Sequence, residues 1–167
     1  DIGLHTMLDM LVDYLPNPNE LNPYVVIDDE GNELVRKTLS SEPFSGYIFK
    51  TIFDQYKGAT YIMKVCSGTV SIGDEVYCPN TQQTLKLSQL FFLSGNRQVT
   101  ATKVNAGDIV AFAKVDNMST GFTICDKNHP IQYPKAKYPT AVYSRAIAAK
   151  NPKEEEKLGA SLNKIQI

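Results

Sequence analysis

The sequence predicts a mainly β protein, an antiparallel β-barrel with a short helix at each end. The first observation is a series of short runs of β-branched and aromatic residues between residues 44 and 115. The second is that turn-forming pairs such as Ser67-Gly68 separate these runs. The third is a helical pattern at each end of the chain. A barrel is favoured over an open sheet because closure removes unpaired strand edges.

The first element is predicted to be an amphipathic helix. Its apolar residues fall on one helical face: Leu4, Met7, Leu8, Leu11 and Leu15. Pro16 and Pro18 end this helix, because proline lacks the amide donor and disfavours helix in the residue before it. The helix begins abruptly, which indicates that it belongs to a larger protein.

The β region is expected to contain a short hairpin followed by seven strands. The hairpin turns at residues 29–32, between runs at 24–27 and 34–35. The later strands are predicted at 44–52, 59–65, 69–72, 75–78, 85–93, 98–104 and 109–115. Two Gly-Asp pairs, Gly73-Asp74 and Gly107-Asp108, each start a strand. We interpret their aspartates as turn residues that bond local amides rather than as catalytic or metal-binding groups.

The last part of the chain predicts a truncated β-α unit. Residues 140–149 alternate as a strand, and Asn151-Pro152 with Glu154 forms a helix-start pattern. Leu158, Leu162 and Ile165 then lie on one helical face. We expect both terminal helices to bury their apolar faces against the barrel or a second copy of the chain.

Composition excludes several classes of protein. No apolar run among the 167 residues approaches the length of about 18 that a membrane helix needs. Cys66, Cys78 and Cys125 are odd in number and lack a C-x-x-C spacing, so we expect free thiols in a reducing, cytoplasmic compartment. The net charge is −1. This value argues against a strongly basic nucleic-acid binder.

The charge is unevenly distributed along the chain. Eight acidic residues precede the first basic residue, Arg36. Residues 36–167 contain the other ten acidic residues and all seventeen basic ones, so this part of the chain carries a charge of +7. Such an excess favours phosphate contact, although a solvated surface is its commoner meaning.

The residues alone predict no catalytic or cofactor site. The phosphate-loop and dinucleotide-binding glycine patterns are absent from the sequence. His5 and His129 are far apart in sequence and lack a nucleophile signature nearby. Aromatic residues at strand-like spacing offer either stacking surfaces for unpaired bases or core packing, and core packing is favoured: Tyr47, Phe49, Phe53, Tyr56, Tyr61, Phe91 and Phe92. The residues alone therefore indicate a β-barrel module whose two terminal segments are not part of the barrel.

Motifs in order along nearly the whole chain resemble bacterial elongation factor G, the translocation GTPase. They are YLPNP at 14–18, EPFSGYIFKT at 42–51, DQYKG at 54–58, Ser67-Gly68 with Gly73-Asp74, Asn96-Arg97, AGDIVA at 106–111, TGFTICD at 120–126, and Tyr138-Pro139 with Ala146-Ile147 and Glu156-Lys157-Leu158. Phe122 and Cys66 depart from the family pattern, which has aspartate and tyrosine there.

The resemblance implies four parts. Residues 1–22 would be the last helix of a GTPase domain, 23–43 a linker with a hairpin, 44–135 the second domain, an antiparallel β-barrel of the translation-factor type, and 136–167 the start of a ferredoxin-like third domain. The implied function is non-catalytic: docking on small-subunit ribosomal RNA and bracing the GTPase domain during GTP-driven translocation. GTP and Mg would bind only in the GTPase domain, whose motifs this chain lacks, so the chain itself is expected to hold no cofactor or metal and to be no enzyme.

Four cations are the candidate RNA contacts: Lys50, Lys57, Arg97 and Lys103. Each lies near a predicted turn or strand end, where a side chain reaches a phosphate backbone without reading its sequence. Three other interpretations stay open at this point. The chain would then be a module of a ribosomal protection protein of the tetracycline-resistance kind, a freestanding oligonucleotide-binding barrel, or an enzyme with a cleft at the barrel mouth. Exposed aromatics on one barrel face would favour the oligonucleotide-binding interpretation.

Overall fold

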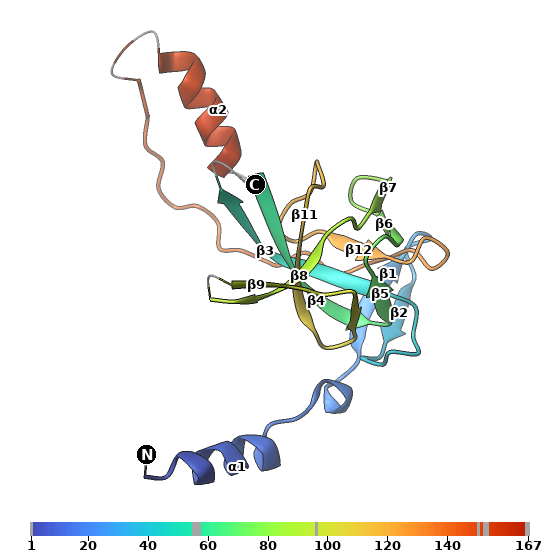
Figure 1. Cartoon of the computed structure of the whole chain (residues 1–167). Coiled ribbons are helices and arrows are strands. Elements are labelled where there is room, and N and C mark those ends of the chain that lie inside the picture. Colours follow the sequence, from blue (N-terminus) through green and yellow to red (C-terminus); the bar gives the residue numbers. More distant parts are fainter. Residues whose placement is uncertain (1, 55–57, 96, 150, 152–153, 166–167) are drawn as a thin grey trace.

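The computed structural model describes residues 2–54, 58–95, 97–149, 151 and 154–165. It is mainly β with antiparallel strands and a helix at each end (Figure 1), as the sequence predicts. In chain order the elements are α1 (Leu4–Tyr14), the 3-10 helix η1 (Pro18–Glu20), β1 (Tyr24–Asp28), β2 (Glu33–Arg36), β3 (Ser45–Asp54), β4 (Gly58–Ser67), β5 (Thr69–Ser71), β6 (Glu75–Cys78), β7 (Gln83–Lys86), β8 (Leu90–Ser94), β9 (Arg97–Thr100), β10 (Lys103–Asn105), β11 (Ile109–Ala113), β12 (Thr123–Cys125), β13 (Ile131–Gln132) and α2 (Glu155–Ile165).

The main sheet curls into a barrel-like body. Its strand order is β7-β6-β12-β3-β4-β11-β8-β9, and β5 pairs with β10 in a second sheet. β7 and β8 lie toward opposite ends of this order, yet only residues 87–89 join them. A link that short requires the sheet to bend back on itself. The N–H of Ala101 donates to the carbonyl of Leu90, which continues the pairing beyond the β8–β9 ladder (2.9 Å).

The barrel interior is a single apolar cluster. Ile48 on β3, Met63 on β4, and Val110 and Phe112 on β11 are fully buried in it. On β3 and β4 these residues alternate with more exposed ones, whereas Ala111 and Ala113 of β11 are buried in a separate small cluster with Phe91. Such alternation is what a half-buried antiparallel strand requires. The cross-strand pairs Val110 with Met63 and Phe112 with Tyr61 therefore face inward, and Lys64, next to Met63 on β4, lines the pocket described below.

The two Gly-Asp turns have the same geometry. In the first, the Asp74 Oδ2 accepts from the Ser71 N–H at 2.8 Å, and in the second the Asp108 Oδ2 accepts from the Asn105 N–H at 2.8 Å. Gly73 and Gly107 both have positive φ, +93° and +99°. These contacts confirm that the aspartates act as turn residues.

The second turn differs from the first in what it contacts. A Cβ built on Gly107 would lie 2.6 Å from the Pro18 Cγ, whereas a Cβ on Gly73 would meet nothing within 4 Å. The η1 segment therefore rests on the Gly107 turn. Asn17 holds η1 as a capping box, its Oδ1 accepting from the Asn19 N–H and its own N–H donating to Glu20.

The Gly107→Ala variant is expected to displace η1 from the barrel. Both Gly107→Ala and Gly73→Ala place a side chain at positive φ, which costs about 1–2 kcal/mol. Only Gly107→Ala also collides with Pro18, so amide hydrogen exchange at Asn19 and Glu20 should accelerate in that variant alone. Equal exchange at these amides in both variants would contradict the contact between η1 and the turn.

Several predicted strands differ in extent from those observed. The run at 85–93 is divided into β7 and β8, and the run at 98–104 into β9 and β10. Each run is divided because its two halves pair with different partners. Leu87, between β7 and β8, bonds to the Gly73 turn, and Val104 pairs with Val70 of β5 instead of continuing β9. Two strands, β12 and β13, were not predicted, because three and two residues are too short to show periodicity.

The expectation that the opening helix packs on the barrel is wrong. No residue of α1 is buried, and Leu4, Leu8 and Leu11 are 44%, 46% and 44% exposed. Figure 1 shows α1 lying away from the barrel. The physical reason is the linker: Leu15 is extended and Pro16 and Pro18 follow it, so the chain leads the helix away rather than back.

The predicted C-terminal strand is also wrong. Residues 140–149 are irregular and pair with no strand of the described chain, so alternation in the sequence is not by itself enough to form a strand here. The closing helix is present as α2. Leu158 is half-buried and Leu162 is 43% exposed, so these two residues of the apolar face are covered only in part. The side chain of Ile165, the third predicted residue of this face, lies outside those that the structure describes.

Candidate functional site

Three of the four predicted RNA-contact cations lie within the described chain, and all three are exposed. Lys50 lies on β3 opposite Ile62, Arg97 begins β9 opposite Ser94, and Lys103 begins β10 opposite Ser71. Lys57 lies outside the described residues. Lys50 and Arg97 belong to the eight-stranded sheet and Lys103 to the two-stranded sheet, so the fold distributes these cations rather than gathering them.

These cations are not neutralised by ion pairs in the described part of the chain. The two ion pairs found there join Arg36 to Glu42 at 3.5 Å and His129 to Asp126 at 3.3 Å. The His129 contact is an exposed loop contact. Lys50, Arg97 and Lys103 therefore present their charge to solvent.

The predicted aromatic set divides between core and surface. Tyr61 and Phe91 are buried, Phe92 packs on the core, and Tyr47 is half-buried. Phe49 and Phe53 are 42% and 45% exposed. Tyr56 lies outside the described residues. Core packing thus accounts for some of these residues, while Tyr47 and Phe49 take part in a surface cavity.

A cavity of about 650 Å³ opens beside β1, β3 and β4. We call it the tyrosine pocket; six of its lining residues are Tyr24, Tyr47, Phe49, Lys64, Cys66 and Tyr133. The ring of Tyr133 meets Tyr24 edge-on at 5.7 Å between centroids and Tyr47 at 6.0 Å. These edge-on contacts hold the rings in place.

Hydrogen bonds to hydroxyl groups hold Tyr133 in place in the wall of the tyrosine pocket. The Tyr133 hydroxyl bonds the Ser45 Oγ at 2.8 Å, and Ser45 bonds the Ser67 Oγ at 2.6 Å. The Tyr133 N–H donates to the Thr123 Oγ1 at 3.0 Å. Because these polar groups satisfy one another, the aromatic faces are left as the main contact surface of the pocket.

The pocket wall carries no negative charge at neutral pH. Burial, the largest cause in each case, raises the pKa of the Tyr47 and Tyr133 phenols and of the Cys66 thiol. All three groups therefore stay protonated and uncharged. The Lys64 ammonium lies 5.9 Å from the centre of the Tyr24 ring, a cation–π contact at the pocket edge.

The cysteines are buried free thiols, as predicted. Burial also raises the pKa of Cys125 to about 11. A protonated, enclosed thiol is a poor nucleophile and a poor metal ligand. Among the described residues, no cluster of three or more histidine, cysteine or acidic side chains is placed to hold a metal ion.

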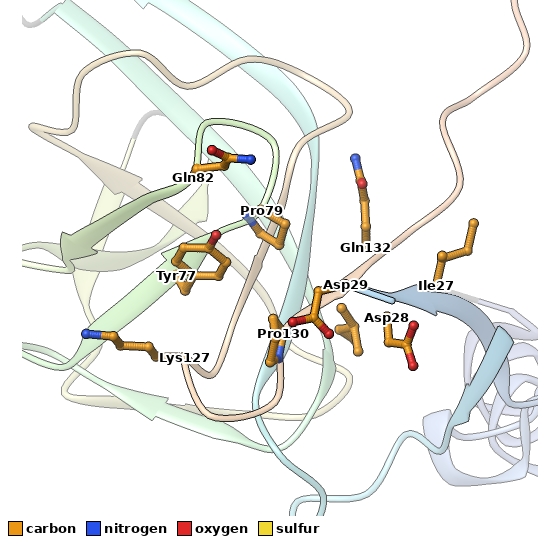
Figure 2. A pocket seen from close by; sticks show the side chains of 10 residues that line it. Ile27, Asp28, Asp29, Tyr77, Pro79, Gln82, Lys127, Pro130 and Gln132 are labelled. Carbon is orange, nitrogen blue, oxygen red and sulfur yellow. The ribbon is translucent and has the colours of Figure 1, made fainter. Parts of the chain in front are cut away.

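A second cavity, of about 470 Å³, has a mixed polar and apolar lining and lies between the β1 end, the β6–β7 hairpin and the segment before β13 (Figure 2). Asp28 and Asp29 lie on one side and Lys127 on the other. The Asp28 Oδ1 accepts from the N–H groups of Glu30 and Asn32. These bonds, chiefly that from Asn32, lower the pKa of Asp28. Its carboxylate therefore serves the hairpin turn.

Sequence reasoning missed most of the tyrosine pocket. Tyr24 comes from the hairpin and Tyr133 from just after β13, more than a hundred residues apart in the chain. They meet because β13 pairs with β1, with Ile27 opposite Gln132. A two-residue strand gives no periodic signal, so the pairing had no visible sequence pattern.

Fold and surface together define a β-barrel module with exposed cations and one aromatic pocket. A family model for domain 2 of elongation factor G matches residues 43–127, half of the chain. The chain therefore belongs to the elongation factor G domain 2 family and is a translation-factor barrel. The match covers β3 to β12, and confirms the resemblance in the barrel.

A solved structure supports the same fold. It is the crystal structure of a protein from Thermus thermophilus, with a TM-score of 0.64 and 17% identity over 97% of this chain. The chain spans 22% of that protein's length. No helix in the described part of the chain is both long and apolar enough to cross a membrane.

Proposed function

We propose that this barrel is a non-catalytic module of an elongation factor G-like GTPase that docks on small-subunit ribosomal RNA. In this role it braces the GTPase domain while GTP hydrolysis drives translocation. GTP and Mg bind in that GTPase domain, outside this chain, and the whole protein acts in the cytoplasm. The family match over residues 43–127 is the observation that carries the proposal.

The surface charges support RNA docking. Lys50, Arg97 and Lys103 are exposed on three strands of the barrel. When exposed cations that are not ion-paired contact RNA phosphates, the counterions condensed on the RNA are released. This release supplies affinity that does not depend on sequence. Their distribution over two sheets suits a broad, irregular RNA surface better than a single groove.

The η1 contact supports bracing. Pro18 rests against the Gly107 turn, so the segment that links α1 to the barrel is held at one point of the body. A linker that is fixed to the barrel at one point limits how the part of the protein before it can move relative to the barrel. In an elongation factor G-like protein the preceding part is the GTPase domain.

Binding of the chain to purified small ribosomal subunits tests the proposal. We expect saturable binding in a sedimentation assay at low salt, weaker binding to large subunits, and a steep loss of affinity between roughly 50 and 200 mM salt. An absence of binding to either subunit at low salt would remove the docking role.

A further inference from the structure

We infer that the tyrosine pocket is a binding site for one unpaired nucleobase of single-stranded RNA, with Lys64 on the adjoining phosphate. This inference rests on the proposed function, because it names the part of an RNA that the module takes. The pocket volume of about 650 Å³ lies within the range of roughly 300–1,000 Å³ that is usual for small-molecule sites.

The shape of the pocket suits a flat, uncharged ring. Tyr24 and Tyr47 each meet the ring of Tyr133 edge-on, and Phe49 adds an exposed ring at the rim. Aromatic side chains at the surface stack on unpaired bases of any sequence, because every base has a π-face. The Tyr133 hydroxyl is already bonded to Ser45 and the surface of the pocket is mainly apolar, so stacking is the main contact that the pocket offers a base.

Charge around the pocket selects a nucleotide over a neutral aromatic ligand. Lys64 lies in the lining, and exposed Lys135 and Lys137 adjoin the lining residues Pro134 and Ala136. No carboxylate occurs among the lining residues found in the described chain. A base in the pocket thus places its phosphates beside cations with no opposing acidic group.

The pocket is separate from the predicted cations Arg97 and Lys103, which lie on β9 and β10. Those cations supply general affinity, whereas the pocket holds a base that has left its helix. An RNA surface with an extruded base would engage both. A fully paired RNA would engage only the cations.

The test compares two probes on the 167-residue chain: a fluorescein-labelled ten-nucleotide uridine RNA and a ten-unit ribose-phosphate strand without bases. The wild-type chain should bind the uridine strand about 5-fold or more tightly than the baseless strand. Phe49→Ala should remove most of that difference and leave the affinity for the baseless strand unchanged. Lys64→Ala should weaken both and reduce the salt slope by about 0.7.

The matched control is Phe53→Ala, which removes the same side chain at similar exposure four residues along β3. It should bind both probes as the wild type does. A second variant, Ala136→Trp, fills the pocket from an exposed position without removing a contact, and it should match Phe49→Ala. Equal binding of the two probes by the wild type, or equal effects of Phe49→Ala and Phe53→Ala, would overturn the inference.

The ribosome assay separates this inference from the proposed function. If the wild-type chain binds small subunits but binds the two RNA probes equally, the docking role stands and the inference is overturned on its own. If the wild type binds uridine RNA through the pocket but no ribosomal subunit, the docking role is lost while the base-binding site stands.

Discussion

The Gly68→Ala variant is expected to lose about 4 kcal/mol or more of unfolding free energy, a large part of the stability of an ordinary domain. Gly68 has φ +70°, and an added Cβ would lie 2.5 Å from the Phe44 N and 2.6 Å from the Glu42 carbonyl oxygen. These are backbone atoms at the entry of β3, so no side chain rotation relieves the collision. Strain at positive φ adds about 1–2 kcal/mol.

The hydrogen bonds around Gly68 explain why the backbone does not move aside. The Gly68 N–H donates to the Leu39 carbonyl at 2.9 Å, and the Gly68 carbonyl accepts from the Ala106 N–H at 2.9 Å. Both bonds would have to stretch to open space for a methyl group. The turn is thereby fixed between the β3 entry and the β10–β11 turn.

Gly73→Ala is the matched control for this prediction, because Gly73 has a similar φ of +93° and open space at its Cβ position. Urea unfolding followed by circular dichroism should give a loss of only about 1–2 kcal/mol for Gly73→Ala. Similar losses in the two variants would show that strain, and not the contact with the β3 entry, decides the cost.

Local residue chemistry explains how much of the fold is visible in the sequence. The structure confirms the features that depend only on residues close together in the chain. These are the Ser67-Gly68 turn, the two Gly-Asp turns and the helix α1. The contact of Gly68 with Glu42 and Phe44 is not visible, although both segments are motifs. It arises only when β3 and β4 pair.

The candidate site is less predictable for the same reason. The structure places Lys50, Arg97 and Lys103 at the surface, but Lys50 lies in the middle of β3 and not near a strand end, because β3 extends to Asp54. The tyrosine pocket needs β13 beside β1, a pairing of two residues across more than a hundred positions. Tyr47 and Phe49 are aromatic and lie in predicted strands, as the buried Phe91 does. Only the structure therefore separates the surface aromatics from the core aromatics.

Reversing the charge of Lys50, Arg97 and Lys103 together is expected to weaken binding to small ribosomal subunits by about 100-fold or more at low salt. Each reversal removes a phosphate contact with its released counterions and adds repulsion. The slope of log affinity against log salt should fall by roughly 2 to 3 units, since duplex contacts contribute about 0.9 each. Stability should change little, because all three side chains are exposed.

The matched control reverses three other exposed lysines, Lys37, Lys86 and Lys127, and so reaches the same net charge. Lys86 lies on the edge strand β7 and Lys127 follows β12, whereas the test cations lie on β3, β9 and β10. If affinity depends on where the cations lie, the control retains most of its binding and its salt slope. If both triple variants weaken binding equally, net charge alone attracts the barrel to RNA, and the three named cations are not its docking surface.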